Sequence, residues 1–285
     1  MTPQAIDVFS KFVKQASGLV LTPDKAYLLE SRLFPVIRRY GLESLDILAE
    51  HLLKPIPDAR LARDVMEAMT TNETSFFRDT RPFDQFRDVL LPKFLEKRAA
   101  QRHIRIWCAA ASCGQEPYSL AMILHEKAAE LAGWRIDILA TDISSEMITK
   151  AQNGLYSQFE VQRGLPVKYL VKHFQQEGDR WKLSQDILKM AKFQTFNLLQ
   201  DFTHFGQFDI IYCRNVLIYF DQPTKENVLR RMGRTLTSDG TLCLGGAETV
   251  LGIAEWFKPL DGQRGIYVLN PDSPAMATLG GAYHA

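Results

Sequence analysis

The sequence is poor in the features that mark secreted, metal-binding or membrane-inserted proteins. Its four cysteines, Cys108, Cys113, Cys213 and Cys243, show no zinc-ligand spacing and indicate no disulfide framework, so we expect reduced thiols and no bound metal. No apolar run approaches the ~18 residues of a membrane span, which argues against direct membrane insertion. The N-terminal stretch MTPQAIDVFSKFVKQ mixes acids and bases, unlike a signal peptide.

The chain also has no large excess of positive or negative charge. The formal net charge is +1, so the chain as a whole offers no general attraction to nucleic acid. Together with the reduced thiols, this balance favours a cytoplasmic protein with no nucleic-acid partner.

The loop after the first expected strand is poor in glycine. The stretch CAAASCGQEPYS (108–119) has only Gly114, where a dinucleotide-binding loop has three glycines. A pyrophosphate requires such a turn, and Glu116 at the start of the next helix would repel it. The carboxylate suits a cation instead, which favours S-adenosylmethionine, a ligand with an adenosine, a sulfonium and an ammonium but no phosphate. A simple interaction of Glu116 with the helix dipole remains the alternative.

The pattern of helix and strand signals along the chain predicts its domains. Residues 1–70 follow helical spacing and predict an all-helical N-terminal domain, and 71–102 form a linker and connecting helix. Strand and helix candidates alternate over 103–270, which predicts an α/β domain with a mostly parallel sheet. A hairpin signal, EGD, predicts a small antiparallel subdomain inserted at about 165–196. The turn-rich end, 271–285, is expected to be a mobile tail.

Polar residues follow three of the expected strands, HIRIWCA, RIDILATD and FDIIYC. Ligands of open α/β sheets bind at the carboxyl ends of the strands, where strand order reverses. Asp142, at the end of the second strand, is placed to accept both ribose hydroxyls of an adenosine, although a helix cap is the alternative for this residue taken alone. Arg214 and Asn215 follow the third strand.

A polar stretch with two phenylalanines, MTTNETSFFRDTRPFDQF (69–86), precedes the sheet. Helix caps and core phenylalanines explain its pattern equally well when it is read alone. Together with WCAAASCGQEPYSLAM, ILATDIS, NLLQDF and FDIIYCRNVLIYFD, however, it resembles the CheR-type chemoreceptor glutamate methyltransferases. The resemblance extends from the N-terminal helices to Asn270. It implies a Rossmann-like class I methyltransferase domain that transfers a methyl group from S-adenosylmethionine to glutamate side chains of chemoreceptors, to which this cytoplasmic enzyme is recruited at the membrane.

The resemblance also implies roles for individual residues. Arg78 is implied to orient the target carboxylate, and Tyr219 to lie beside the transferred methyl group. The positions implied to bind the cofactor are Asn72, Thr74, Arg78, Glu116, Asp142, Asn197, Leu198, Arg214 and Asn215.

A basic stripe is expected on the second helix. Lys25, Arg32 and Arg39 are spaced by seven residues, with Arg38 beside them, so an intact helix would align them. The resemblance implies that these residues bind the acidic methylation region of the receptor, and a solvated surface is the alternative. Pro35 predicts a bend in this helix.

The inserted hairpin departs from the family pattern. Its connection, QQEGDR, is shorter than the loop with which family members dock a receptor's C-terminal pentapeptide, so that docking is in doubt. On the residues alone, three other functions stay open: a nucleic-acid or small-molecule methyltransferase, a nicotinamide-dependent oxidoreductase, and a non-catalytic cofactor-binding adaptor.

Overall fold

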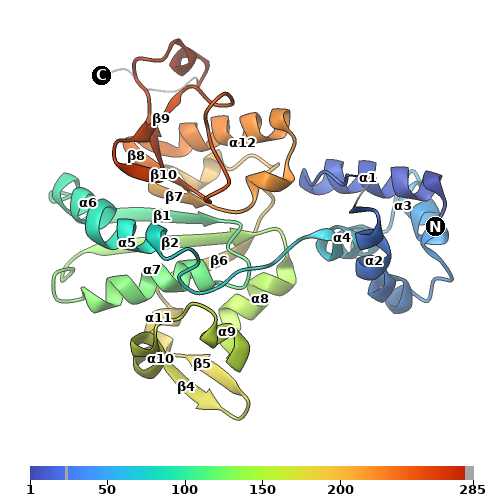
Figure 1. The fold of residues 1–285 in the computed structure, drawn as a ribbon, viewed down its shortest axis with the longest axis horizontal. Helices are drawn as coiled ribbons and strands as arrows, with labels where there is room; N and C mark the ends of the chain where they lie inside the picture. Colours follow the sequence, from blue (N-terminus) through green and yellow to red (C-terminus); the bar gives the residue numbers. More distant parts are fainter. Residues whose placement is uncertain (23–24, 280–285) are drawn as a thin grey trace. The chain divides into compact units, whose positions relative to one another are not determined.

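The computed structural model describes residues 1–22 and 25–279, which fold into two compact units (Figure 1). The first unit comprises Met1–Thr71 together with Tyr219–Thr224, and the second comprises Asn72–Ile218 with Lys225–Ala285. Within the described ranges, no helix is both long and apolar enough to cross a membrane.

The first unit is helical, as the sequence predicts. Its helices are α1 (Pro3–Ser17), α2 (Tyr27–Tyr40), α3 (Leu45–Leu52) and α4 (Ala59–Met69). Thr2, Ser44 and Asp58 begin α1, α3 and α4 because their side-chain oxygens accept hydrogen bonds from backbone amides of the first turn. The apolar faces meet in a core of fully buried side chains that includes Phe9, Val13, Leu29, Leu33, Leu48 and Val65.

Two features of this unit go beyond the sequence pattern. Pro35 lies inside α2, which is not broken there and continues to Tyr40, and the bend at Pro35 stays a prediction. A segment from far along the chain also joins the unit: Leu19 and Phe220 form an antiparallel bridge, and Lys14 Nζ lies 2.7 Å from the carboxylate of Asp221. The pattern of residues 1–70 does not reveal this segment, because the contacts are made by tertiary folding.

The second unit contains a seven-stranded sheet in the order β6-β2-β1-β7-β8-β10-β9. Its strands are β1 (His103–Ala109), β2 (Arg135–Asp142), β6 (Ala191–Thr195), β7 (Phe208–Cys213), β8 (Leu236–Leu244), β9 (Phe257–Leu260) and β10 (Gln263–Leu269). The first five are parallel, and β10 is antiparallel to both β8 and β9. Strands β2 and β6 lie on one side of β1, and the later strand β7 lies on its other side. Strand order therefore reverses between β1 and β7. The Rossmann-like α/β fold is therefore confirmed.

The remaining elements of the second unit connect these strands. They are α5 (Arg81–Gln85), the π-helical turn η2 (Phe86–Leu90), α6 (Leu91–Lys97), α7 (Gln115–Glu126), α8 (Ser145–Asn153), α12 (Gln222–Thr235) and the 3₁₀ turns η3 (Thr203–Phe205), η4 (Leu217–Tyr219) and η5 (Pro274–Thr278). Helix α7 is buried from Gln115 to Leu124, which explains why its apolar residues do not form a single stripe.

The small antiparallel sheet is present, but its bounds differ from 165–196. Its order is β3-β5-β4, with β3 (Leu155–Ser157), β4 (Phe174–Glu177) and β5 (Arg180–Leu183), and it is accompanied by α9 (Gln158–Gln162), α10 (Val167–His173) and α11 (Gln185–Leu188). Strand β3 begins the insertion earlier and is too short to show an alternating pattern. Strand β6 lies inside the expected range, yet it pairs in parallel with β2 and belongs to the main sheet.

The beginning of the expected mobile tail is packed. Leu279 is fully buried, and its carbonyl accepts a hydrogen bond from Nε of Arg234. A Cβ at Gly233 would lie 3.1 Å from Leu279 Cδ2 and 3.3 Å from the ring of Trp256, so the glycine leaves room for both side chains. The expectation was wrong as far as Leu279, since composition does not reveal that a single leucine enters the core. Residues 280–285 lie outside the described part of the chain.

Candidate active site

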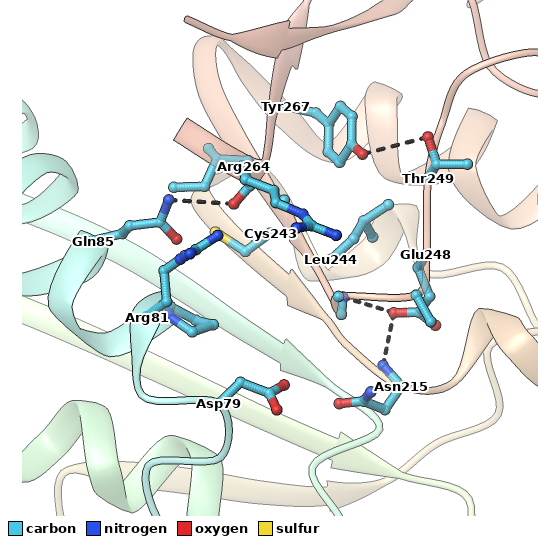
Figure 2. Close-up of a pocket in the computed structure, with 16 residues that line it drawn as sticks. Asp79, Arg81, Gln85, Asn215, Cys243, Leu244, Glu248, Thr249, Arg264 and Tyr267 are labelled. Atoms are coloured by element: carbon cyan, nitrogen blue, oxygen red, sulfur yellow. Dashed lines mark hydrogen bonds between the residues drawn. The ribbon is translucent and has the colours of Figure 1, made fainter. Parts of the chain in front are cut away.

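The carboxyl edge of the sheet carries a cavity of about 760 Å³ beside the ends of β8 and β10 (Figure 2). This volume lies within the range of small-ligand pockets. Asn215 and Asp79 line one side of the cavity, and Cys243, Arg81 and Arg264 line others. It therefore adjoins the strand ends from which the sequence predicts ligand-binding residues.

The loop between β1 and α7 places its glycine where space is most restricted. Gly114 has φ 89°, and a Cβ there would lie 2.9 Å from both Ala151 Cβ and Tyr118 Cε2. Ala110 and Ser112 also have positive φ values, 64° and 49°, although neither is glycine. Such backbone conformations cost free energy and occur most often at functional sites. The loop thus needs only one glycine to reach a shape in which its backbone turns sharply at the sheet edge.

Asp142 holds this loop in place. Its carboxylate accepts hydrogen bonds from Ser112 N at 2.7 Å and from Ser144 N at 2.9 Å. The N-cap of α8 is Ser144, whose hydroxyl accepts from Met147 N at 3.3 Å, so the helix-cap alternative for Asp142 was wrong. The side chain therefore ends β2 as a carboxylate fixed between two backbone segments.

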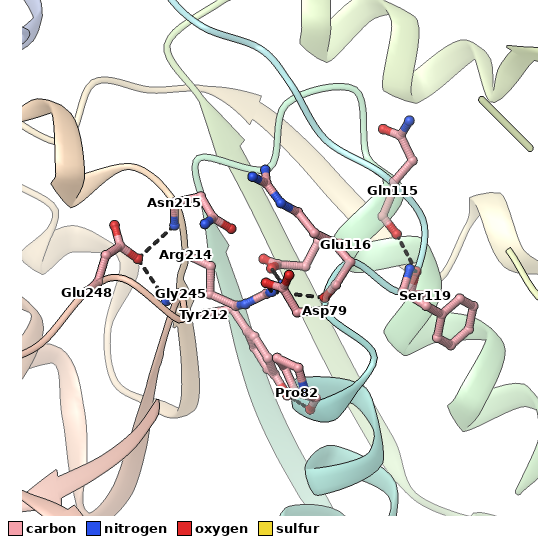
Figure 3. A network of polar contacts seen from close by, with 12 residues as sticks. Asp79, Pro82, Gln115, Glu116, Ser119, Tyr212, Arg214, Asn215, Gly245 and Glu248 are labelled. Carbon is pink, nitrogen blue, oxygen red and sulfur yellow. Dashed lines mark hydrogen bonds and ion pairs between the residues drawn. The ribbon is translucent and has the colours of Figure 1, made fainter. Parts of the chain in front are cut away.

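Glu116 and Arg214 meet where strand order reverses (Figure 3). Arg214 Nη1 lies 2.8 Å from Glu116 Oε2, and Nη2 lies 2.8 Å from Asp79 Oδ2 and 3.0 Å from the carbonyl oxygen of Arg78. The side chain of Arg214 is only 2% exposed, and that of Glu116 is 10% exposed. Two carboxylates therefore share one guanidinium group, which leaves an excess of negative charge at this point of the sheet.

Burial and charge act in opposite directions on this pair. Burial raises the pKa of Glu116, and the adjacent guanidinium and the Cys108 thiol only partly offset that effect. Burial also lowers the pKa of Arg214, but the carboxylates of Glu116 and Asp79 outweigh it, so the pKa is raised overall. Arg214 consequently stays charged at any physiological pH, and its charge keeps Glu116 ionised more readily than burial alone would allow.

Glu248 is an important residue that the sequence analysis missed. Its carboxylate accepts hydrogen bonds from Asn215 N at 2.7 Å and Gly245 N at 2.8 Å (Figure 3). It also accepts from Val216 N at 3.0 Å and Ile218 N at 3.3 Å. It holds the segment after β7 in the conformation in which Asn215 has φ 59°. The motif GGAE (245–248), an acid just after a strand, was a signal in the sequence that could have pointed to Glu248. The sequence does not show its hydrogen bonds, because the four amides belong to two segments far apart in the chain.

The linker 72–80 attaches to the loop and to α7. The carbonyl of Asn72 accepts from Ser112 Oγ at 2.8 Å, and Phe77 N donates to Ser119 Oγ at 2.9 Å. Phe77 is buried, so the phenylalanines of the FFRD motif do serve the core. Arg78 is half-buried and donates from Nη1 to the carbonyl of Glu73 at 2.8 Å.

The residues after β6 lie beside this arrangement. Asn197 Oδ1 accepts from Leu199 N at 2.9 Å, and Leu198 is 7% exposed. Because β6 pairs with β2, Asn197 and Asp142 follow neighbouring strands, and Phe196 N donates to the carbonyl of Asp142 at 2.7 Å. Thr74 lies half-buried in the linker, and Tyr219 belongs to the first unit.

The predicted basic stripe does not form. Lys25 precedes the start of α2 at Tyr27, so it cannot share a helical face with the arginines. Arg32 donates to the carbonyls of Met69 at 2.7 Å and Thr70 at 3.0 Å, where it satisfies the end of α4.

Two exposed arginines remain on the predicted surface. Arg39 lies 2.8 Å from the carboxylate of Asp64, and Arg38 stacks over the ring of Phe34 at 4.7 Å. The predicted stripe was therefore wrong for Lys25, because the helix starts after it, and Arg32 is engaged by the end of α4. A role of these residues in receptor binding stays a prediction.

Comparison with known proteins decides the family. Residues 72–266 match the family described as CheR methyltransferase, SAM binding domain, and residues 4–70 match CheR methyltransferase, all-alpha domain. The chain belongs to the CheR methyltransferase family. A "Chemotaxis protein methyltransferase Cher2" of Pseudomonas putida is 37% identical over 262 residues, covering 90% of this chain and 94% of that protein. A "Chemotaxis protein methyltransferase" of Vibrio parahaemolyticus is 40% identical over 254 residues, covering 88% and 90%.

This CheR-family chain is an S-adenosylmethionine-dependent methyltransferase, and its geometry fits that cofactor. The excess negative charge around Arg214 suits a sulfonium and an ammonium, and Asp142 ends β2 with a carboxylate held by backbone amides. Across residues 1–22 and 25–279, no group of three or more His, Cys, Asp or Glu side chains is placed to hold a metal ion.

Proposed function

We propose that the protein methylates glutamate side chains of chemoreceptors and forms γ-carboxyl methyl esters. The observation that carries the proposal is the match of both units to CheR domains, over residues 4–70 and 72–266. Relatives that match along most of their length are named chemotaxis protein methyltransferases, which supports a role in chemotaxis. The protein would act in the cytoplasm and be recruited to receptors in the membrane.

The reaction does not require a general base from the protein. A glutamate carboxylate is already ionised at neutral pH, so its oxygen can attack the methyl carbon directly. The new bond is O–CH₃, the S–CH₃ bond breaks, and S-adenosylhomocysteine leaves without any proton transfer. Catalysis then depends on positioning the two partners and excluding water.

We assign that positioning to Arg78 and Tyr219. A guanidinium group has five N–H donors, and Arg78 uses one of its nitrogens on the carbonyl of Glu73, which leaves donors for a substrate carboxylate. We expect Arg78 to orient the acceptor without fully neutralising it, since a tight ion pair would weaken the nucleophile. The Tyr219 hydroxyl would add a hydrogen bond near the transferred methyl group.

The cofactor assignment rests on neighbouring strand ends. Asp142 would accept from the ribose hydroxyls, and the charges of Glu116 and Arg214 would face the methionine part of the molecule. Asn72, Thr74, Asn197, Leu198 and Asn215 complete the proposed contacts.

We infer that receptor C-terminal peptides bind weakly to the insertion. Only Gly178 and Asp179 separate β4 from β5, and Gly178 has φ 62° as such a turn requires. A two-residue turn provides little loop to close over an added peptide strand. The exposed Arg38 and Arg39 are a better candidate surface for receptor recognition.

The proposal is tested by incubating the enzyme with methyl-labelled S-adenosylmethionine and membranes that contain receptors. The expected product is label on the receptor that mild base releases as methanol. Tyr219→Phe should lower the single-turnover rate more than it lowers cofactor affinity, whereas Arg78→Ala should reduce both. Tyr27→Phe and Arg102→Ala are matched controls, because these side chains are exposed and lie outside the proposed site. Label that resists base, or that stays off the receptors, would refute the substrate assignment.

A further inference from the structure

We propose that the cavity beside β8 and β10 binds a second carboxylate of the protein substrate, close to the acceptor glutamate, through Arg81 and Arg264. This inference rests on the proposed function, because it assumes that the substrate is an acidic protein segment. It adds a recognition site for the residues that flank the acceptor.

Arg81 and Arg264 give the cavity its positive charge. Arg81 begins α5, Arg264 lies on β10, and both side chains extend into the cavity (Figure 2). Both are exposed, and neither guanidinium group has an ion pair or hydrogen bond with the residues that the structure describes. Two free guanidinium groups at one cavity form a natural site for a carboxylate, since their paired N–H donors match its oxygens.

The acidic groups of the cavity already have partners of their own. Asp79 shares Arg214 with Glu116 and lies 2.8 Å from it, and Glu248 accepts from backbone amides at 2.7–3.3 Å. Cys243 lies at the cavity wall, where burial raises the pKa of its thiol to about 12, so it carries no charge at neutral pH. The charged hydrogen-bond donors that remain free for an incoming carboxylate are therefore those of Arg81 and Arg264.

The topology places this cavity on the other side of β1 from the proposed ribose and adenine contacts. The proposed ribose and adenine contacts follow β2 and β6, on one side of β1, whereas the cavity lies by β8 and β10, beyond β7. Asn215, which follows β7, lines the cavity. A substrate that enters from the β8–β10 side would thus meet the cofactor at the point where strand order reverses. Its neighbouring side chains would lie over Arg81 and Arg264.

A carboxylate at this position would make the enzyme select among glutamates. An acceptor with an acidic neighbour would gain charge-assisted hydrogen bonds to the two guanidinium groups. An acceptor with neutral neighbours would leave both guanidinium groups unpaired and bind less tightly.

Binding of a receptor cytoplasmic fragment to the full-length enzyme loaded with S-adenosylhomocysteine tests this without any turnover. Two fragments are compared, one with glutamates beside the acceptor and one with glutamines there. Wild type should bind the acidic fragment about tenfold more tightly, which corresponds to ~1.4 kcal/mol. The double variant Arg81→Ala, Arg264→Ala should bind both fragments alike and keep its affinity for S-adenosylmethionine. Each single variant, Arg81→Ala and Arg264→Ala, is compared with Arg102→Ala, which also removes one positive charge but lies just before β1, at the amino ends of the strands.

The outcomes separate the two hypotheses. A double variant that still prefers the acidic fragment would overturn the cavity assignment, and so would a loss of cofactor affinity, which would assign the arginines to the cofactor's own carboxylate. Arginine-dependent binding without methyl transfer would overturn the proposed function and leave the cavity assignment standing. Absence of binding to either fragment by wild type would overturn both.

Discussion

Asp142, at the end of β2, and Glu116, in the first turn of α7, are carboxylates with different partners, and this difference suits them to different roles. Asp142 is held by the backbone amides of Ser112 and Ser144, so its position is set by the loop and by the start of α8. Glu116 faces the guanidinium group of Arg214, so its charge is balanced by another side chain. The first is suited to accept hydrogen bonds from a neutral ribose, and the second to shape the electrostatic field at the reacting centre.

Replacing Asp142 with alanine should weaken S-adenosylmethionine binding by about 1.5–3 kcal/mol, the scale of charge-assisted hydrogen bonds. Some loss of thermal stability should accompany it, because two backbone amides lose their acceptor. Titration calorimetry measures the affinity, and a thermal scan monitors the fold. Asp137→Ala removes a carboxylate from the same strand, β2, and should leave cofactor affinity unchanged. If Asp142→Ala binds the cofactor as wild type does, the carboxylate has a structural role alone.

The buried pair predicts strong coupling between Glu116 and Arg214. Arg214→Met should destabilise the fold by about 3–5 kcal/mol, because it leaves Glu116 buried without its cation. Glu116→Gln should cost less, since Arg214 keeps Asp79 as a partner. The double variant should be more stable than Arg214→Met alone. Denaturant unfolding of all four proteins measures this, and additive losses would contradict the coupling.

At the level of elements, the insertion is joined to α7 through two histidines. His173 on α10 is 3% exposed, and its ring lies edge-on to that of His125 on α7, with centroids 5.1 Å apart. His173 Nε2 and His125 Nδ1 are buried without a hydrogen-bond partner among the described residues. Burial lowers the pKa of His173 to about 4, helped first by the neighbouring His125 and then by Lys172, and opposed by Glu126. The contact therefore favours a neutral ring.

This contact predicts a loss of stability in mild acid. The unfolded chain takes up the proton of His173 near pH ~6.5, whereas the folded chain resists it until pH is near 4. Stability should consequently be complete above about pH 7 and fall by roughly 2 kcal/mol by pH 5. Denaturant midpoints between pH 7.5 and 5 measure the slope, which His173→Phe should reduce and His51→Gln, on α3, should not. An unchanged slope in His173→Phe would assign the acid sensitivity to other groups.

At the level of the whole molecule, a net charge of +1 gives little long-range attraction to an acidic receptor. Any electrostatic guidance has to come from local surfaces. Arg38 and Arg39, at the exposed end of α2, form one such surface, with the ring of Phe34 beneath Arg38. A cationic surface of this kind raises the encounter rate and fixes register more than it raises final affinity.

Charge reversal of Arg38 and Arg39 to glutamate should slow receptor methylation several-fold at low salt and leave cofactor affinity unchanged. Raising salt from about 0.05 to 0.5 M should reduce the difference, because exposed charges are then screened over only ~4 Å. Initial methylation rates at both salt concentrations provide the test. Reversal of Arg60 and Arg63, exposed on α4, changes net charge equally and is the control. Equal slowing by both pairs would indicate a general charge effect and not recognition by α2.

The sequence by itself determined the parts of this protein that local chemistry controls. Strands β1 and β2 have the predicted bounds, because polar and apolar residues alternate where each strand starts and a short apolar run follows, which is buried in the parallel sheet. The helix starts at Thr2, Ser44 and Asp58 follow from side chains that bond to their own first turn. The glycine-poor loop also indicated the cofactor class, since it lacks what a pyrophosphate needs.

Only the tertiary structure decided the contacts between segments that are distant in the chain. In the folded chain, Glu116 forms an ion pair with Arg214, and Glu248 accepts hydrogen bonds from backbone amides after β7 and β8. Arg32 donates hydrogen bonds to the carbonyl groups at the end of α4 and is not part of an exposed basic stripe. Each of these partners is set by strand order and helix packing, which bring together residues that no periodicity or spacing relates. Charges and hydrogen-bond donors find their final partners only when the backbone has placed them within about 3 Å of one another.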